Sequence, residues 1–394
     1  MSASSPSNTA TTPAAKAPWL DRRRWLWWSA LIVPILPFVG LALFNWTQSN
    51  WVWWIGPVVL YGLIPVLDHL IGTDRANPPE SVLPDLVADK YYGRLLRVFL
   101  VLQYAALILG AWVAVSSGLN WIGLLGLILT IGIVSAGGIN AAHEMGHQRG
   151  GGLMAKLALA PAAYGHFLVE HNRGHHVRVA TPEDPASSRL GESYWRFLPR
   201  TVIGSLRSAW ALEKTRLTRA GLPTWHYSNE LLQGWSMTVV LFGLLALVLG
   251  PAVLPFLLVQ AAYGSSLLET VNYIEHYGLL RQREENGRYQ RCLPEHSWNS
   301  NHLVTNLMLY QLQRHSDHHA HPTRPYQALR HFDDSPQLPA GYAALIPVAF
   351  ITPRWYRLMD RRVLAHYGND LSRCNVQPGY RPPKDLDLRT AEVA

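Results

Sequence analysis

Residues 121–147 read WIGLLGLILTIGIVSAGGINAAHEMGH. Residues 121–140 contain no charged side chain, and at 1.5 Å per residue they form a helix of about 30 Å, the thickness of a bilayer's hydrocarbon core. The end of the stretch carries His143 and His147, whose i, i+4 spacing places both imidazoles on one helix face. The stretch therefore predicts a membrane-spanning helix that brings two histidines to one membrane surface.

Five further apolar stretches extend this pattern to six predicted spans: residues 25–44, 51–71, 96–116, 121–140, 231–249 and 252–275. Only 15% of the 394 residues are charged, against about 25% in soluble domains. The short connections within successive pairs of spans contain no Lys or Arg, so the positive-inside rule places them away from the cytoplasm. We predict an all-α integral membrane protein with three helical hairpins and both termini in the cytoplasm.

Charge and cysteine content exclude several classes of protein. The formal net charge is +8, but the basic residues flank the spans, so membrane topology accounts for them without nucleic-acid binding. The two cysteines, Cys292 and Cys374, are far apart, which excludes a disulfide framework and a thiolate metal site. We expect a disordered leader (1–18), one membrane domain (19–374) and a C-terminal tail (375–394).

Nine of the 17 histidines form four groups at or beyond the predicted cytoplasmic ends of the spans: His143 and His147; His171, His175 and His176; His276; and His315, His318 and His319. Nine neutral imidazoles exceed the coordination positions of one transition metal, so the sequence predicts a histidine-rich cytoplasmic cap that holds two metal ions. Nearby carboxylates could accept the second ring N–H of such ligands or could be solvated charges: Glu144, Glu170, Glu275 and Asp317. Glu269, seven residues before His276, could tune the metal site, snorkel to the interface or form an interhelical hydrogen bond.

Two kinds of metal chemistry are compatible with these residues. His143-Glu144-Met-Gly-His147 matches the H-E-x-x-H pattern of zinc proteases, in which two histidines bind zinc and the glutamate activates water. That function needs one further ligand and leaves the other histidine groups without a role. A pair of histidine-rich sites beside hydrocarbon suits iron and O₂ chemistry on an apolar substrate.

The strings AHEMGH (142–147), EHNRGHH (170–176), NYIEHYG (272–278) and LQRHSDHHA (312–320) resemble those of the membrane di-iron desaturases and hydroxylases, and in particular the bacterial alkane 1-monooxygenases. The likeness continues through TPEDPAS (181–187) and HPTRPY (321–326), and Gln148 departs from the lysine often found there. The resemblance implies that the nine histidines bind two irons and that this di-iron centre is itself the catalytic group.

The resemblance also implies terminal hydroxylation of n-alkanes to 1-alkanols in the bacterial inner membrane, with O₂ and electrons from rubredoxin and its NAD(P)H-dependent reductase. A hydroxylase of aromatic methyl groups or fatty acyl chains, and a desaturase, remain alternatives. Because rubredoxins are generally acidic, we expect Arg173, Arg178 and Arg314 to help in docking or in ordering the ligands. Candidates for the substrate channel are Trp28, Trp53 and Trp54.

Overall fold

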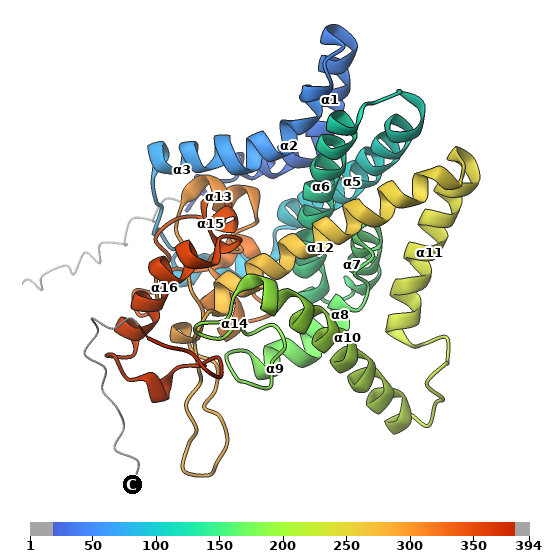
Figure 1. Ribbon diagram of the computed structural model, residues 1–394. Helices are drawn as coiled ribbons and strands as arrows, with labels where there is room; N and C mark the ends of the chain where they lie inside the picture. Colours follow the sequence, from blue (N-terminus) through green and yellow to red (C-terminus); the bar gives the residue numbers. More distant parts are fainter. Residues whose placement is uncertain (1–18, 383–394) are drawn as a thin grey trace, which may run out of the picture.

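The computed structural model describes residues 19–382, so the predicted leader and residues 383–394 of the predicted tail lie outside the described residues. The described chain is helical and contains no β-strand, as predicted (Figure 1). Its α-helices are α1 (Ile32–Thr47), α2 (Ile55–Val58), α3 (Ile64–Ile71), α4 (Leu83–Ala88), α5 (Lys90–Ser116), α6 (Trp121–His147), α7 (Gly152–Leu159), α8 (Phe167–Glu170), α9 (His176–Arg178), α10 (Tyr194–Arg219), α11 (Glu230–Leu249), α12 (Leu254–His276), α13 (Leu303–Met308), α14 (His315–Ala320), α15 (Tyr342–Ala349) and α16 (Thr352–His366).

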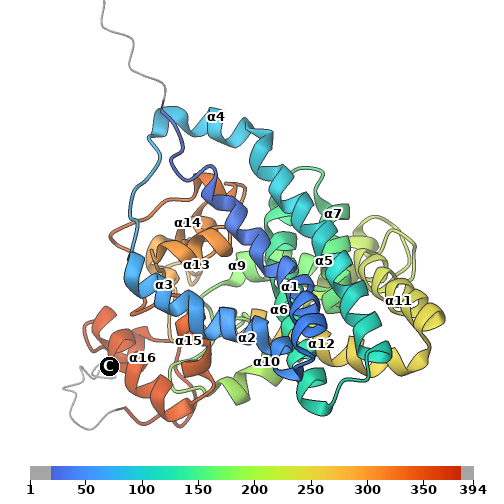
Figure 2. The same ribbon diagram turned by 90° about the horizontal axis from the view of Figure 1, so that it is seen from above.

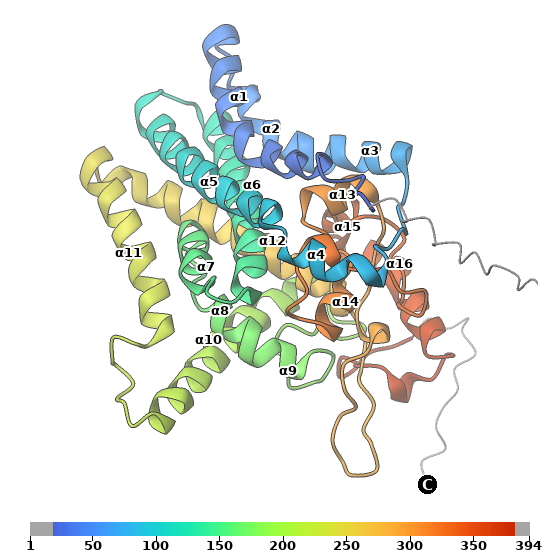
Figure 3. The ribbon, with the colours of Figure 1, turned by 180° about the vertical axis from the view of Figure 1, so that it is seen from behind.

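Six helical segments of the described chain are long and apolar enough to cross a membrane, which confirms the predicted number of spans. They comprise α1, α2 with α3, α5, α6, α11 and α12 together with their short flanking turns. Figures 1 and 3 show α5 beside α6, whereas α11 and α12 meet at one end and separate toward the other. The helix α6 continues without a break through His147, so its two histidines do share one helical face.

A close contact between small residues joins α6 to α12. A Cβ atom added to Gly132 would lie 2.9 Å from the carbonyl oxygen of Gln260, and one added to Gly264 would lie 2.8 Å from the carbonyl oxygen of Gly132. Beside this contact the Ser135 hydroxyl donates to Gln260 Oε1 at 2.7 Å. Small residues let helix backbones approach closely in membranes, where packing replaces the hydrophobic effect. The histidines at the ends of α6 and α12 therefore have a fixed relative position.

Polar contacts fix the shorter helices below the spans. The buried carboxylate of Asp68, near the end of α3, accepts hydrogen bonds from the backbone N–H and the hydroxyl of Thr305 on α13. Arg314, directly before α14, is buried and donates to the carbonyl oxygens of Asp74 and Leu329. Seen from above, α13 and α14 lie on the opposite side of the molecule from α11 (Figure 2). These contacts hold α14 below the ends of the long helices.

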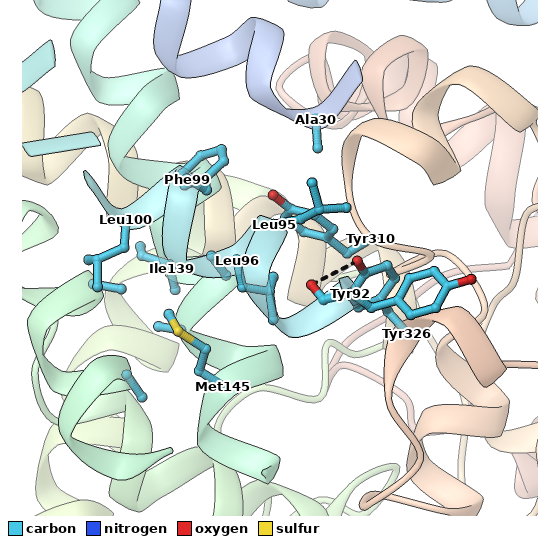
Figure 4. Close-up of a cluster of buried hydrophobic side chains, with 14 of the residues drawn as sticks. Ala30, Tyr92, Leu95, Leu96, Phe99, Leu100, Ile139, Met145, Tyr310 and Tyr326 are labelled. Carbon is cyan, nitrogen blue, oxygen red and sulfur yellow. Dashed lines mark hydrogen bonds between the residues drawn. The ribbon is translucent and has the colours of Figure 1, made fainter. Parts of the chain in front are cut away.

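An aromatic cluster supports the lower end of α6 (Figure 4). The Tyr326 hydroxyl donates to the carbonyl oxygen of Tyr92 at 3.2 Å, and the rings of Tyr92 and Tyr310 pack against that of Tyr326. The backbone N–H of Tyr326 donates to Glu144 Oε2 on α6. The cluster thus links α5 and the segment after α14 to the helix that carries His143.

Replacing Gly264 by leucine should force α6 away from α12, because no space exists for a side chain at this contact. Overpacking of this kind costs about 1–3 kcal/mol, so the detergent-solubilised variant should unfold several degrees below the unaltered protein in a thermal scan. Gly243→Ala on α11 is the matched control, since its added Cβ would meet no atom within 4 Å. Equal unfolding temperatures for the two variants would contradict this account of the α6–α12 contact.

Candidate metal centre

The structure brings all nine predicted histidines together in two groups. Within each group one ring nitrogen from every histidine lies within 4.8 Å of the others. The first, the five-histidine group, contains His143, His147, His171, His176 and His318; the second, the four-histidine group, contains His175, His276, His315 and His319. In Figure 1 the elements that carry them meet where α6 and α12 end above α8, α9 and α14.

The Nε2 atoms of the five-histidine group form a continuous chain of short contacts. His318 Nε2 lies 2.9 Å from His143 Nε2 and 3.1 Å from His176 Nε2. His171 Nε2 lies 2.9 Å from His176 Nε2 and 3.1 Å from His147 Nε2. A neutral imidazole uses each nitrogen either as a donor or as an acceptor, so hydrogen bonds between the rings cannot pair all five Nε2 atoms. A single positive ion at the point where these atoms converge would bind them better than they bind one another.

The four-histidine group lies directly beside the first. His315 Nε2 and His319 Nε2 are 2.8 Å apart, and the His276 ring centroid is 5.1 Å from that of His315 and 5.3 Å from that of His319. Both ring nitrogens of His276 and Nε2 of His175 are buried without a hydrogen-bond partner. Buried polar atoms are nearly always paired, so these nitrogens identify a place for a ligand that accepts electron pairs.

The distances between ring nitrogens are compatible with a bound metal ion in each group. Two nitrogens bound to one ion at roughly 2.1 Å lie about 3.0–3.4 Å apart. The five Nε2 contacts described above measure 2.8–3.1 Å, and all ligand atoms of a group lie within 4.8 Å of one another.

The electrostatic surroundings keep the histidines in the form that binds metal. Burial, reinforced by repulsion between neighbouring imidazoles, lowers the pKa of five of these side chains well below the usual value: His171, His176, His315, His318 and His319. These rings are therefore neutral at pH 7, and a neutral imidazole has the free electron pair that a metal requires.

A change of helix type distributes the second histidine string between the two groups. Residues His171–His175 form a π-helical segment, in which residue i bonds to residue i+5. His171 consequently meets His176, five residues later, in the five-histidine group, whereas His175 points to the four-histidine group. In a regular α-helix the i, i+4 spacing would place His171 and His175 on one face; the wider turn assigns them to different groups.

Asp184 orients one of the histidines and was not among the predicted site residues. His175 Nδ1 lies 2.9 Å from Asp184 Oδ2, which also accepts a 2.7 Å hydrogen bond from the Ser187 hydroxyl. Burial alone would raise the pKa of this carboxyl, but attraction and hydrogen bonding from His175, together with the bond from Ser187, lower it to about 2. The ionised Asp184 thus fixes the ring so that its Nε2 faces the other three histidines.

The five predicted carboxylates have different partners. Glu275 Oε2 lies 3.1 Å from His315 Nε2, and Glu144 Oε1 lies 3.4 Å from His143 Nδ1. Three others bind elsewhere: Glu170 pairs with Arg178, Asp317 pairs with Arg324, and Glu269 accepts hydrogen bonds from Tyr164, Thr201 and Asn272. Glu269 nevertheless lines a small cavity together with His171 and His175.

An apolar cavity of about 80 Å³ lies among the spans. It is lined by Val33, Leu60, Ile64, Phe99, Ile133, Ala136, Gly137, Asn140, Leu267, Leu268, Val271, Thr305, Met308, Leu309, Leu312, Ala343 and Ile346. The three predicted channel tryptophans are not among these residues. Trp28 is largely exposed, Trp53 packs against Gly40, and the Trp54 ring N–H donates to the Ile122 carbonyl near the start of α6, far along that helix from its histidines.

Comparison with known proteins gives consistent results. A model of the fatty acid desaturase family matches residues 119–349. The chain is 46% identical to an alkane 1-monooxygenase of Acinetobacter baylyi over 92% of its own length and 90% of the relative's. It is 48% identical to alkane 1-monooxygenase 1 of Alcanivorax borkumensis over the same shares of the two chains. A xylene/toluene monooxygenase hydroxylase component of Pseudomonas putida is 26% identical over 89% of this chain and 91% of the relative.

Replacing Asp184 by alanine should weaken metal binding at the four-histidine group, because His175 loses the carboxylate that orients it. Loss of such a partner reduces metal affinity by roughly 10–100-fold. Titration of the metal-depleted protein with Co²⁺ against a competing chelator, followed by visible absorption, should show one weakened site and one unchanged site. The control is Asp333→Ala, since Asp333 is exposed and its one ion pair among residues 19–382 is with His331. Unchanged binding at both sites of Asp184→Ala would refute this role.

Proposed function

The chain belongs to the fatty acid desaturase family and, within it, to the alkane 1-monooxygenases, and on this premise we propose that it hydroxylates the terminal methyl group of n-alkanes. The balanced reaction joins an alkane, O₂, two electrons and two protons to give a 1-alkanol and water. The observation that carries the proposal is the apolar cavity whose lining comes within one turn of His143 on α6. Asn140 lines the cavity three residues before His143 on that helix, and Leu312 lines it three residues before His315 in the turn that precedes α14.

We propose iron as the metal, with one ion in each histidine group. Imidazole is a good ligand for iron, so the five nitrogens of one group and the four of the other would hold the two ions. The participation of nine histidines argues against a zinc protease built on HEMGH, which needs only one further ligand. When bound, the irons supply the activation of O₂ that insertion into an unactivated C–H bond requires.

The protein's own side chains hold and shield the reactants. The apolar lining binds a hydrocarbon chain by excluding water, and the same exclusion protects an oxidising species from side reactions. The six spans and the basic connections favour the bacterial inner membrane, with the histidine groups and both termini on the cytoplasmic side. An aromatic methyl group or a fatty acyl chain would also fit an apolar cavity, and product analysis distinguishes these substrates and a desaturase from an alkane hydroxylase.

The protein should contain about two irons and convert octane to 1-octanol when supplied with rubredoxin, its reductase, NADH and O₂. His315→Ala should abolish product formation and lower the iron content, because His315 belongs to the four-histidine group. His321→Ala is the matched control, since His321 is half-exposed and lies outside both groups. Metal analysis and gas chromatography are the measurements. One zinc per chain and no alcohol would favour the protease alternative instead.

We propose rubredoxin as the electron donor and an open groove beside the five-histidine group as its docking surface. His147 of that group is only partly buried and lines this groove together with Lys90, Arg97 and Arg149. These three cations are exposed and form no ion pair among the described residues. Asp89, also in the groove, is already paired with Arg24. An acidic donor bound here would approach the metal site through His147, the shortest route that the groove offers.

The arginines predicted from the sequence are less suited to docking. Arg314 is buried and bonded to backbone carbonyls, so it orders the segment before α14 rather than meeting a partner. Arg173 pairs with Glu213 and Glu230, and Arg178 pairs with Glu170. Their positive charge is therefore largely compensated, whereas that of the groove beside His147 is not.

Reversing two charges in the groove, Lys90→Glu with Arg149→Glu, should raise the KM for rubredoxin severalfold and leave the maximal rate nearly unchanged, because long-range attraction chiefly affects encounter. The difference from the unaltered protein should shrink as salt is added, since screening removes it. The control is Arg219→Glu with Lys214→Glu on α10, which leaves the groove intact. An equal rise in KM for both double variants would rule out this groove as the specific docking surface.

A further inference from the structure

One residue that lines the apolar cavity carries a buried polar atom without a hydrogen-bond partner. Of its lining residues only Asn140 and Thr305 have polar side chains. The Thr305 hydroxyl donates to Asp68 and is therefore engaged. Asn140 is only 6% exposed, and its Oδ1 has no hydrogen-bond partner. A buried acceptor left unpaired costs about 1–3 kcal/mol, so this atom is a candidate for contact with a ligand that donates a hydrogen bond.

The orientation of the Asn140 amide is fixed by its other end. Its Nδ2 donates to the carbonyl oxygen of Leu309 at 2.8 Å. Turning the amide over would place Oδ1 against that carbonyl, so that two acceptors would face each other. The amide oxygen is therefore held as an acceptor, whereas the Thr305 hydroxyl is turned toward Asp68.

The position of Asn140 matches the site of the chemistry. It lies on α6 three residues before His143, so its side chain occupies the end of the cavity nearest the five-histidine group. An alkane has no donor for this acceptor, whereas a primary alcohol has an O–H on the carbon that has just reacted. The substrate and the product would thus make the same apolar contacts with the cavity, but only the product would donate a hydrogen bond to Asn140 Oδ1.

We propose that Asn140 Oδ1 is a binding site for the hydroxyl group of a primary alkanol, which the cavity holds with its hydroxyl toward the histidine groups. This inference rests on the proposed function, because it assigns the same cavity to the hydrocarbon. The alcohol's O–H donates to Oδ1, and its chain occupies the space of the alkane. The protein consequently retains its product in competition with a new substrate molecule.

The test is equilibrium binding in lipid nanodiscs without an electron donor, so that no turnover occurs. Displacement of radiolabelled octane would be measured for 1-octanol and for 1-chlorooctane, which is similar in length but has no O–H. Asn140→Leu keeps the number and branching of the side-chain heavy atoms and removes the acceptor; it should weaken displacement by 1-octanol roughly tenfold, the size expected for one buried hydrogen bond, and leave 1-chlorooctane unchanged. Because partition into the lipid is the same for every variant, it cancels in this comparison.

Met308→Leu is the control for a volume-conserving change of the lining, and it should leave both ligands unchanged. Equal weakening of 1-octanol and 1-chlorooctane by Asn140→Leu would overturn the proposal and assign Asn140 to the shape of the cavity or to a bound water. No weakening of either would place the hydroxyl elsewhere and overturn it too.

The unaltered protein alone keeps the proposal testable if Asn140→Leu does not fold. After correction for partition into protein-free nanodiscs, 1-octanol should then displace octane at lower concentration than 1-chlorooctane does, and equal potency would overturn the proposal. If octane itself fails to bind saturably, the proposed substrate is refuted. This outcome differs from saturable binding of octane with no preference for 1-octanol over 1-chlorooctane, which overturns the role of Asn140.

Discussion

Nine imidazoles with converging nitrogen atoms, seven of them buried and two partly buried, impose the constraint on which this structure depends. Their rings are close enough to repel one another when protonated and cannot all be satisfied by mutual hydrogen bonds. A bound cation removes this conflict, so metal binding contributes to the stability of the fold as well as to its chemistry. The glycine contact between α6 and α12, the Asp68–Thr305 bonds and the buried Arg314 hold the rings in place from three directions.

The division of the histidines between two sites follows from local helix geometry. Pairs spaced i, i+4 on α-helices stay together: His143 with His147, and His315 with His319. The π-helical segment His171–His175 breaks this rule, and consecutive residues, His175 and His176, serve different groups. The two proposed metal sites are therefore connected through a single peptide bond, and one extra residue in a helical turn sets the allocation of ligands.

The sequence alone was sufficient to predict the helical class, the six spans and the histidines that come together, because length, hydropathy and spacing are local properties. The partners that depend on tertiary contacts could not be predicted in this way. Asp184 reaches His175 only because the loop 179–193 folds back. From the sequence Arg314 is indistinguishable from a surface cation, and only the fold supplies its three carbonyl partners. Asn140 reads as one polar residue in an apolar helix, and only the Leu309 contact defines which of its atoms is free.

The firm attachment of α6 to α12 has a consequence for how the protein meets membranes of different composition. In its most apolar window 61% of α6 is buried by other parts of the chain, whereas only 17% of α11 is. Hydrophobic mismatch is relieved by tilting helices or deforming lipid. Peripheral helices such as α11 can absorb that strain while the glycine contact keeps the central pair at a constant angle. Bilayer thickness can then vary with temperature or lipid supply without altering the spacing of the histidines.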